Sequence, residues 1–193
     1  MKGGCQTLVG DNMTRSNLRI SVFVLLAVMA ALSCNKDNGD VLFELKFPPP
    51  PIEFVIQPGL GTFDTHVFIQ SPIPSYYEAR LEDSGRSDDE VTLIQAKDAY
   101  LSSLFDDANL NFIQRVSIYI FDPFNPADKV EFFYLEDIPY KEKTSLRLFP
   151  GITDIKDWVK SGFFGLEIRL DFREITPALV EMKLEFDLRA IAE

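Results

Sequence analysis

Residues 164–173 read FGLEIRLDFR, and residues 180–189 read VEMKLEFDLR. In both stretches every second residue is apolar, and the residues between them are charged apart from Gly165. Side chains of a β-strand alternate between its two faces, so each stretch predicts a strand with one dry face and one solvated face. Such strands are typical of antiparallel sheets that cover a core on one side. We expect the two strands to pair as a final antiparallel hairpin.

The chain before these two strands contains further strand patterns, separated by Pro, Gly, Asp and Asn. The strand-like runs cover residues 41–47, 52–56, 63–70, 76–81, 91–105, 115–121, 129–135 and 144–149. Many short strands with turn signals between them are typical of β-sandwiches and barrels. We therefore predict one all-β domain over residues 41–193, an antiparallel β-sandwich with one or two short helices.

Three segments of this domain predict turns or helices rather than strands. Thr153 can cap a helix over residues 154–160, because acidic residues follow in its first turn and a glycine comes just after its end. Residues 109–114 are compatible with one helical turn that closes an end of the core. A turn rich in Pro and Asp is expected over residues 122–128, between two antiparallel strands.

The N-terminal part of the chain has a different pattern. Residues 20–32 read ISVFVLLAVMAAL, a run without a charge that follows Arg15 and Arg19. A membrane-spanning helix needs about 20 apolar residues, whereas a shorter run behind positive charges and before a small residue is typical of a secretory signal. We predict a signal peptide over residues 1–33. Met13 is the predicted translational start, since residues 1–12 fit no signal pattern.

The end of this run, Ala31-Leu32-Ser33-Cys34, resembles the lipobox of Gram-negative outer-membrane lipoproteins. In that family the cysteine thiol carries diacylglycerol, the signal is cut before the cysteine, and the new amino end takes a fatty acyl chain such as palmitate. The resemblance implies cleavage between Ser33 and Cys34, lipid attachment at Cys34, and an acylated tether over residues 34–40. The alternatives are an ordinary cleaved signal with a chance cysteine and a buried apolar helix.

The resemblance also implies a location. Asn35 stands where an aspartate retains members of that family at the inner membrane, so the expected location is the outer membrane, facing either the periplasm or the cell surface. Residues 91–193 further resemble the β-sandwich domains of uncharacterised envelope lipoproteins, through the short turn at Phe112-Ile113, the strand over residues 116–120 and the late helix that contains residues 154–158. These are packing motifs, so the resemblance implies a fold and a location but no activity.

Composition excludes several classes of function. Removal of residues 1–33 takes away three basic residues and one acidic residue, which changes the net charge from −11 to −13. Nucleic-acid binding needs a basic surface and is not expected. Cys5 and Cys34 are the two cysteines of the chain, and both would be lost or acylated on processing. The mature domain would therefore hold neither a disulfide nor a thiolate metal site.

Catalytic and metal-binding patterns are weak. His66 is the single histidine and lies in an alternating run, so we expect a half-exposed strand residue rather than a catalytic base. The loop that holds Asp122, Asn125 and Asp128 has the spaced oxygens that calcium prefers, and it remains a weak calcium candidate beside a solvated turn. No cofactor is indicated. A hydrolase that uses two carboxylates stays open as an alternative, because acidic residues are numerous.

Aromatic residues supply the other functional candidates. Tyr76, Tyr77, Tyr134 and Trp158 could stack on sugar rings if they are exposed, or could fill the core if they are not. The sequence thus predicts a lipid-anchored envelope protein without catalysis, which acts as a binding or assembly module through a sheet edge or loops. Its predicted partners are the membrane, through the acyl chains on Cys34, and an envelope protein or glycan. The alternative is a carbohydrate-binding accessory lipoprotein that uses exposed aromatics.

Overall fold

The computed structural model describes residues 39–47 and 50–192, and residues from Gly39 onward form one compact unit. Within the described residues there are nine strands, two α-helices and one 3-10 helix. The strands are β1 (Asp40–Lys46), β2 (Ile52–Ile56), β3 (His66–Pro74), β4 (Leu93–Ser103), β5 (Ile113–Asp122), β6 (Asn125–Leu135), β7 (Ser145–Pro150), β8 (Phe163–Phe172) and β9 (Val180–Ala192). The helices are α2 (Tyr77–Ser84), η1 (Asp88–Glu90) and α3 (Lys156–Lys160).

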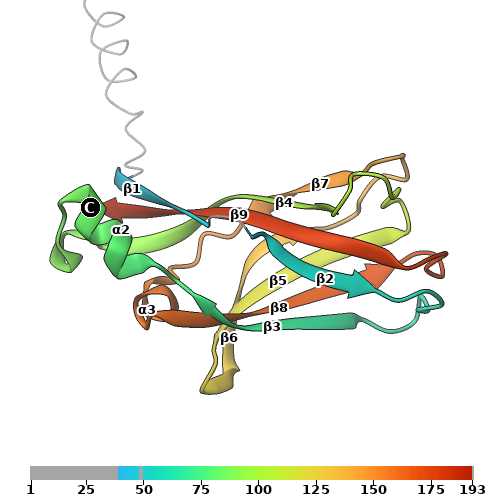
Figure 1. The fold of residues 1–193 in the computed structure, drawn as a ribbon, viewed down its shortest axis with the longest axis horizontal. Coiled ribbons are helices and arrows are strands. Elements are labelled where there is room, and N and C mark those ends of the chain that lie inside the picture. Colours follow the sequence, from blue (N-terminus) through green and yellow to red (C-terminus); the bar gives the residue numbers. More distant parts are fainter. Residues whose placement is uncertain (1–38, 48–49, 193) are drawn as a thin grey trace, which may run out of the picture. The chain divides into compact units, whose positions relative to one another are not determined.

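The strands form two facing layers, all paired antiparallel (Figure 1). One layer contains β1 and β2 beside β9, then β4 and β7; the other contains β6, β5, β8 and β3. Strand β7 pairs with both β4 and β6, so it carries the hydrogen-bonded path from one layer into the other. On the opposite flank the path ends at β1 and β3, and the sheet is not closed. The antiparallel β-sandwich predicted from the sequence is confirmed.

The final two strands lie in different layers, so the predicted hairpin between them is wrong. Strand β8 pairs with β3 and β5, whereas β9 pairs with β1, β2 and β4. The dry faces of both strands are buried as predicted, but they face each other across the core instead of lying side by side. The seven residues between the strands, 173–179, pass from one layer to the other.

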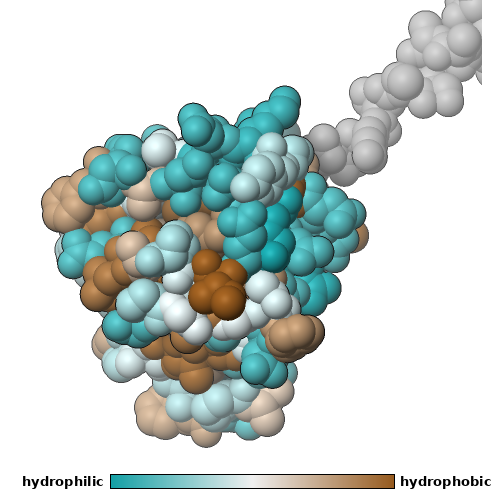
Figure 2. Space-filling view, turned by 90° about the vertical axis from the view of Figure 1, so that its right-hand side faces the viewer, coloured by the Kyte–Doolittle hydropathy of each residue, from teal (hydrophilic) through white to brown (hydrophobic). Residues whose placement is uncertain are grey.

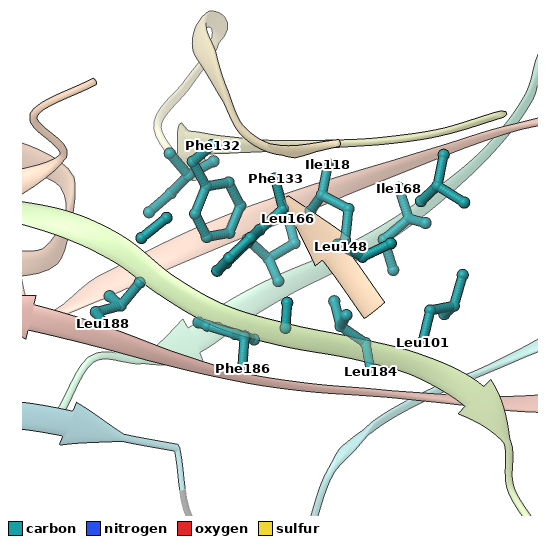
Figure 3. Close-up of a cluster of buried hydrophobic side chains, with 14 of the residues drawn as sticks. Leu101, Ile118, Phe132, Phe133, Leu148, Leu166, Ile168, Leu184, Phe186 and Leu188 are labelled. Carbon is teal, nitrogen blue, oxygen red and sulfur yellow. The ribbon is translucent and has the colours of Figure 1, made fainter. Parts of the chain in front are cut away.

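The core fills the space between the layers with aliphatic and aromatic side chains (Figure 3). Leu184, Phe186 and Leu188 of β9 point toward Phe133 and other buried side chains of the facing layer. The Phe186 ring lies within 4.4–6.4 Å of four other phenylalanine rings, measured between ring centroids. Such edge-to-face and offset contacts add to the free energy gained from burial alone.

The two ends of the sandwich are built differently. One end holds α2, η1 and α3, together with the start of β1 and the end of β9, where Asp40 pairs with Ala192. We call it the helical end. The other end, on the right in Figure 1, consists of connections between strands, and we call it the loop end. Its four loops cover residues 57–65, 104–112, 136–144 and 173–179.

Residues 76–81 form the start of a helix and not the strand expected from the sequence. Helix α2 buries Tyr77 and Leu81, which are four residues apart and therefore lie on one helical face. Glu78, Ala79 and Arg80 between them are good helix formers. Gly85, at φ 66°, ends the helix in the left-handed conformation that glycine adopts without strain.

Two connections differ in detail from the sequence predictions. The turn expected over residues 122–128 is limited to Pro123 and Phe124, since β6 begins at Asn125. Helix α3 begins at Lys156, whose backbone N–H donates to the Asp154 carboxylate at 3.0 Å, so Asp154 rather than Thr153 supplies the capping oxygen. The same carboxylate also accepts the backbone N–H of Ile94 in β4 at 2.9 Å, so Asp154 ties the start of α3 to the sheet.

Candidate functional site

A groove lies on the open flank of the sandwich, where the edge strands of the two layers face each other. Its floor is formed by Leu184 and Phe186 of β9, and its walls by Ile52 from one layer and Ile73 and Tyr76 from the other. Its volume is about 210 Å³. We call it the flank groove. It is smaller than the 300–1,000 Å³ typical of sites for drug-sized ligands, so it suits one aromatic ring or a short aliphatic chain.

The sequence creates the flank groove by interrupting an edge strand. Strands β1 and β2 both pair with β9, but residues 47–51 separate them. Pro50 and Pro51 have no backbone N–H to donate, so they cannot continue the ladder along β9. Phe47 folds inward at the break, and its ring stacks on Phe186 with 4.4 Å between centroids. The break leaves β9 uncovered there, which opens the groove.

The lining of the flank groove is apolar, with little charge. Glu185 is its one charged lining residue in the described part of the chain, and Tyr76 adds a phenol. Tyr76 is 51% exposed and has φ 54°, a left-handed conformation that is uncommon for a tyrosine. An apolar ligand group would gain about 25 cal/mol for each Å² removed from water, which makes burial the dominant attraction that this groove can offer.

The four aromatic residues predicted as ligand candidates do not come together at one site. Tyr76 lines the flank groove, whereas its neighbour Tyr77 is 1% exposed and its hydroxyl donates to Asp88 at 2.7 Å. Trp158 is half-buried on α3 and donates its indole N–H to the carbonyl of Asp128 at 3.4 Å. Tyr77 and Trp158 are thus engaged within the fold and offer a ligand little free ring surface.

Tyr134 forms a separate exposed pair. It lies opposite Phe149 where β6 meets β7, and their ring centroids are 6.0 Å apart at an interplanar angle of 43°. Both rings are exposed on the outer surface. A tilted pair of this kind could contact a sugar ring from two sides, but it is not the flat platform on which a chain of sugars stacks.

The predicted calcium residues surround a hairpin tip. The Asp122 carboxylate accepts the backbone N–H of Phe124 at 2.9 Å, so it stabilises its own turn. Asn125 pairs with Asp122, and Asp128 lies further along β6 with an exposed side chain. In the described part of the chain no group of three or more His, Cys, Asp or Glu side chains could hold a metal ion.

His66 is the half-buried strand residue predicted from the sequence. Its Nε2 donates to the Gly61 carbonyl at 2.8 Å, and its ring stacks on Phe172 with 4.7 Å between centroids. The imidazole therefore closes the loop that precedes β3. Its ring is occupied by the fold rather than directed toward a nucleophile.

Carboxylates gather in a hollow of about 530 Å³ at the loop end. Asp64, Glu136, Asp137 and Asp171 line it together with Arg115. Asp171 is engaged, because it accepts 2.7 Å hydrogen bonds from Thr65 Oγ1 and Arg115 Nε. This open hollow is one place where the two carboxylates of a hydrolase, the alternative left open by the sequence, could lie, and that alternative stays a prediction.

Asp88 organises the helical end. Its carboxylate accepts the Tyr77 hydroxyl, pairs with Lys160 and lies 3.4 Å from Lys156 Nζ. The hydrogen bond from Lys160, with that from Tyr77, lowers the pKa of Asp88 to about 2. Burial raises the pKa of Tyr77 well above its ordinary value, so the phenol remains a donor. This network joins α2, η1 and α3.

A second charged network lies on the outer face of β8. Glu167 is almost fully buried between Lys129 and Arg169, at 2.8 Å and 2.6 Å. Burial acts to raise the pKa of Glu167, but the hydrogen bonds from Lys129 and Arg169 outweigh it and the pKa is lowered. The Arg169 guanidinium also covers the Tyr119 ring at 4.6 Å. The single carboxylate is thus paired with two cations at the sheet surface.

The residues of the predicted lipid attachment lie outside the described residues. These are Ser33, Cys34 and the rest of the tether up to Asn38, together with Met13 and the signal run. Among the residues that are described, no helix has the length and apolar character needed to cross a membrane. Comparisons with protein-family models, with curated proteins and with solved structures find no match to this chain.

Tyr76, a predicted ligand candidate, lines a groove that the sequence does not predict. The other lining residues Ile52, Ile73 and Glu185 carry no functional signal in the sequence. The sequence feature that indicates the groove is the run of prolines that begins at residue 48, because it interrupts the edge strand that pairs with β9. A break in an edge strand beside an aromatic residue indicates an opening in the flank, although it does not fix the size of that opening.

Proposed function

We propose that this chain is a lipid-anchored binding module of the Gram-negative outer membrane, without catalysis of its own. The observation that supports binding is the flank groove, an apolar opening on a sandwich whose two layers are joined by β7. The sequence of residues 13–34 supports the anchor, because it has the charges, the apolar run and the cysteine of a lipoprotein signal.

The two parts of the proposal use different physics. Each buried CH₂ group of an acyl chain contributes about 0.8 kcal/mol, and stable anchoring takes more than one chain, so a triacylated Cys34 would stay in the membrane. The flank groove offers a much smaller area. We expect it to bind one apolar group, carried by a partner in the envelope, with weak to moderate affinity.

The anchor is tested by metabolic labelling with an alkynyl palmitate analogue in a Gram-negative host. We expect the wild-type chain to be labelled and to sediment with the outer membrane. Cys34→Ser should lose the label and become soluble, whereas Cys5→Ser should behave as wild type because Cys5 precedes the cleavage site. Label retained by Cys34→Ser would contradict the proposal.

The groove is tested with fluorobenzene, an uncharged probe with one aromatic ring whose fluorine NMR signal shifts and broadens on binding. The protein is the signal-less chain with Cys34→Ser. We expect saturable binding, weakened about tenfold or more by Ile73→Trp, which fills the groove. Val67→Trp is the matched control, since Val67 lies on the same strand but is exposed on the outer face. Equal loss in both variants would contradict binding in the groove.

A second candidate function is carbohydrate binding, which the exposed pair of Tyr134 and Phe149 favours. Glycan-array screening of the same protein would detect it, and a signal lost in Tyr134→Ser but kept in Tyr100→Ser would assign it to this pair. Tyr100 is a comparably exposed tyrosine on the other layer. A blank array would remove this candidate and leave the groove proposal intact.

A further inference from the structure

The loop end carries large apolar side chains that the fold leaves in water. They are Phe63, Phe105, Ile175 and Leu179, from three of the four loops; the fourth loop holds Tyr140, which is exposed but whose hydroxyl hydrogen-bonds with Glu174 and whose ring lies 5.9 Å from the Arg173 guanidinium. Phe63 is 99% exposed, and Phe105 and Leu179 line one hollow of about 210 Å³. Figure 2 faces this end and shows apolar areas interleaved with hydrophilic ones. Single exposed apolar residues are ordinary, but a group of them at one end of a domain indicates an interaction surface.

The loops that carry these side chains are tied to one another. Thr176 is 2% exposed; its hydroxyl donates to the Gln57 carbonyl at 2.7 Å and accepts the Leu60 N–H at 2.9 Å. The Leu104 N–H donates to the Glu181 carbonyl at 2.7 Å, next to the hollow lined by Phe105 and Leu179.

Further backbone hydrogen bonds join the loop over residues 104–112 to the loops over residues 136–144 and 173–179. The Leu110 N–H donates to the Lys143 carbonyl at 2.7 Å, and the Arg173 N–H to the Phe112 carbonyl at 2.9 Å. Every loop of this end is therefore bonded to another loop or to a neighbouring strand. A partner would meet a surface whose backbone is already fixed, which lowers the entropy lost on binding.

The charge of the loop end selects the kind of partner. The four loops contain seven acidic residues and three basic ones. One of the basic residues, Arg173, directs its guanidinium to the carbonyls of Ile113 and Ile138 and so offers little charge to a ligand. Opposite charge on a partner favours encounter and fixes orientation. An anionic lipid surface would be repelled.

The position of the loop end also suits docking. The chain joins the sandwich at Asp40, which pairs with Ala192 at the helical end. Strand β9 has 13 residues and runs from the loop end to the helical end, about 43 Å at 3.3 Å per residue. The first residue of β1 and the loop end therefore lie at opposite ends of β9.

We propose that the loop end is a docking surface for a basic polypeptide segment with large apolar side chains. Phe63, Phe105 and Leu179 would contact the apolar side chains of the partner, and the acidic residues between them would pair with its lysines or arginines. This surface is separate from the flank groove, and the proposal does not depend on the function proposed for that groove.

The test uses fluorescein-labelled peptides of about 12 residues, a length that spans an extended docking site. One peptide combines Lys with Leu, a second replaces Lys by Glu, and a third replaces Leu by Ser. Binding to the signal-less chain with Cys34→Ser is followed by fluorescence anisotropy at several salt concentrations. We expect saturable binding of the Lys/Leu peptide, weaker as salt rises, and little binding of the other two.

Variants then locate the contact. Phe63→Ser combined with Phe105→Ser should weaken binding about tenfold or more, as loss of apolar contacts at the centre of an interface does. Asp106→Asn with Asp107→Asn should weaken binding less and reduce its salt dependence. Phe124→Ser is the matched control, because Phe124 is 95% exposed at the β5–β6 hairpin tip, away from the loop end.

The outcomes separate the possibilities. Equal weakening by Phe124→Ser and by the loop-end pair, or equal binding of the Lys/Ser and Lys/Leu peptides, would overturn the proposal in favour of general attraction. No binding of the Lys/Leu peptide up to about 0.1 mM, where the free energy of binding is only about −5 kcal/mol, would also overturn it. Ile73→Trp should leave peptide binding unchanged, so failure here is distinct from failure of the flank groove.

Discussion

The two ends of this sandwich cover the core in different ways. At each end the chain must pass from one strand to the next and keep the apolar side chains between the layers out of water. At the helical end, Tyr77 of α2 is buried, and its hydroxyl donates to the Asp88 carboxylate of η1, which also pairs with two lysines of α3. At the loop end, backbone hydrogen bonds and Thr176 hold the connections together, and aromatic residues such as Phe63 remain in water.

The difference indicates which end is available for function. Burying an aromatic residue and satisfying its hydroxyl stabilises the fold, so the helical end is built from groups that the fold itself uses. The loop end buries Leu110, Phe112 and Ile138 in the core, but it reaches its conformation while Phe63, Phe105, Ile175 and Leu179 stay exposed. Their exposure carries no benefit for stability, and this is why the loop end is the better candidate for an interaction with another molecule.

The largest expected effect comes from truncation of the buried aromatic residue at the helical end. Tyr77→Ala removes a ring that is almost fully buried and leaves Asp88 with two lysines but no hydroxyl. We expect the free energy of unfolding to fall by about 3–5 kcal/mol, as for other buried aromatic residues. Urea unfolding followed by circular dichroism measures it.

Tyr77→Phe separates the two parts of this effect. It keeps the ring and removes the hydroxyl, so it should cost only about 1–2 kcal/mol. If Tyr77→Ala and Tyr77→Phe destabilised the protein equally, the hydroxyl rather than burial of the ring would hold the helical end together.

The next effect concerns the residue that ties the loop end. Thr176→Val keeps the shape of the side chain but removes the hydroxyl that bridges the Gln57 carbonyl and the Leu60 N–H. We expect a loss of about 2 kcal/mol, because buried polar groups lose their partner. Amide hydrogen exchange should accelerate at Leu60 and Gly59 while amides of β9 stay protected. Uniform acceleration would show that Thr176 supports the whole fold and not the loop end alone.

Much of the fold can be predicted from the sequence, because the alternation of apolar and polar residues along a strand indicates which of its faces is buried. It identifies the buried faces of β8 and β9 correctly, and composition and turn residues identify the sandwich. Alternation does not state which strand is the neighbour. The segment 173–179 is long enough either to close a wide hairpin or to cross between layers, and the packing of the two dry faces against each other decides for the crossing.

The sites are less predictable, because they depend on what surrounds a residue. Tyr76 and Tyr77 are adjacent and chemically identical, yet one lines the flank groove and the other is buried. Tyr76 precedes α2 in a left-handed conformation, whereas Tyr77 is the first residue of the helix and lies on its buried face with Leu81. Exposure of Phe63 and Phe105 likewise follows from loop conformation. Sequence patterns carry little information about side chains that the core does not need.

A smaller effect is expected from pH at the helical end. The pKa of Asp88 is about 2 in the folded protein, against 3.8 for an unperturbed aspartate. A lowered folded pKa stabilises the protein above the unfolded pKa, and this stability is lost as pH falls from about 4 to about 2. The loss is expected to be about 1–2 kcal/mol, less than the full shift of pKa implies, because the carboxylate is partly solvated.

Asp88→Asn isolates this contribution from other carboxylates with lowered pKa, such as Glu167. The stability difference between wild type and Asp88→Asn should be constant near pH 6 and should shrink between pH values of about 4 and 2. A difference that does not change with pH would mean that the charge of Asp88 contributes nothing and that only the shape of the network matters.

The smallest expected effect tests the other side of the comparison. Phe63→Ser removes a ring that is almost entirely in water, so the free energy of unfolding should change by less than about 0.5 kcal/mol. The exposed ring contributes no free energy of burial to the monomer, so its removal costs none. We expect a stable protein whose loop-end surface alone is altered. Differential scanning calorimetry of Phe63→Ser beside Tyr77→Ala measures both ends by the same method.

Destabilisation of Phe63→Ser comparable to that of Tyr77→Ala would mean that the ring packs against the fold in solution. The loop end would then no longer be the surface available for binding. An unchanged midpoint would leave the aromatic residue without a role in folding, which is the condition that a binding residue at this position must meet.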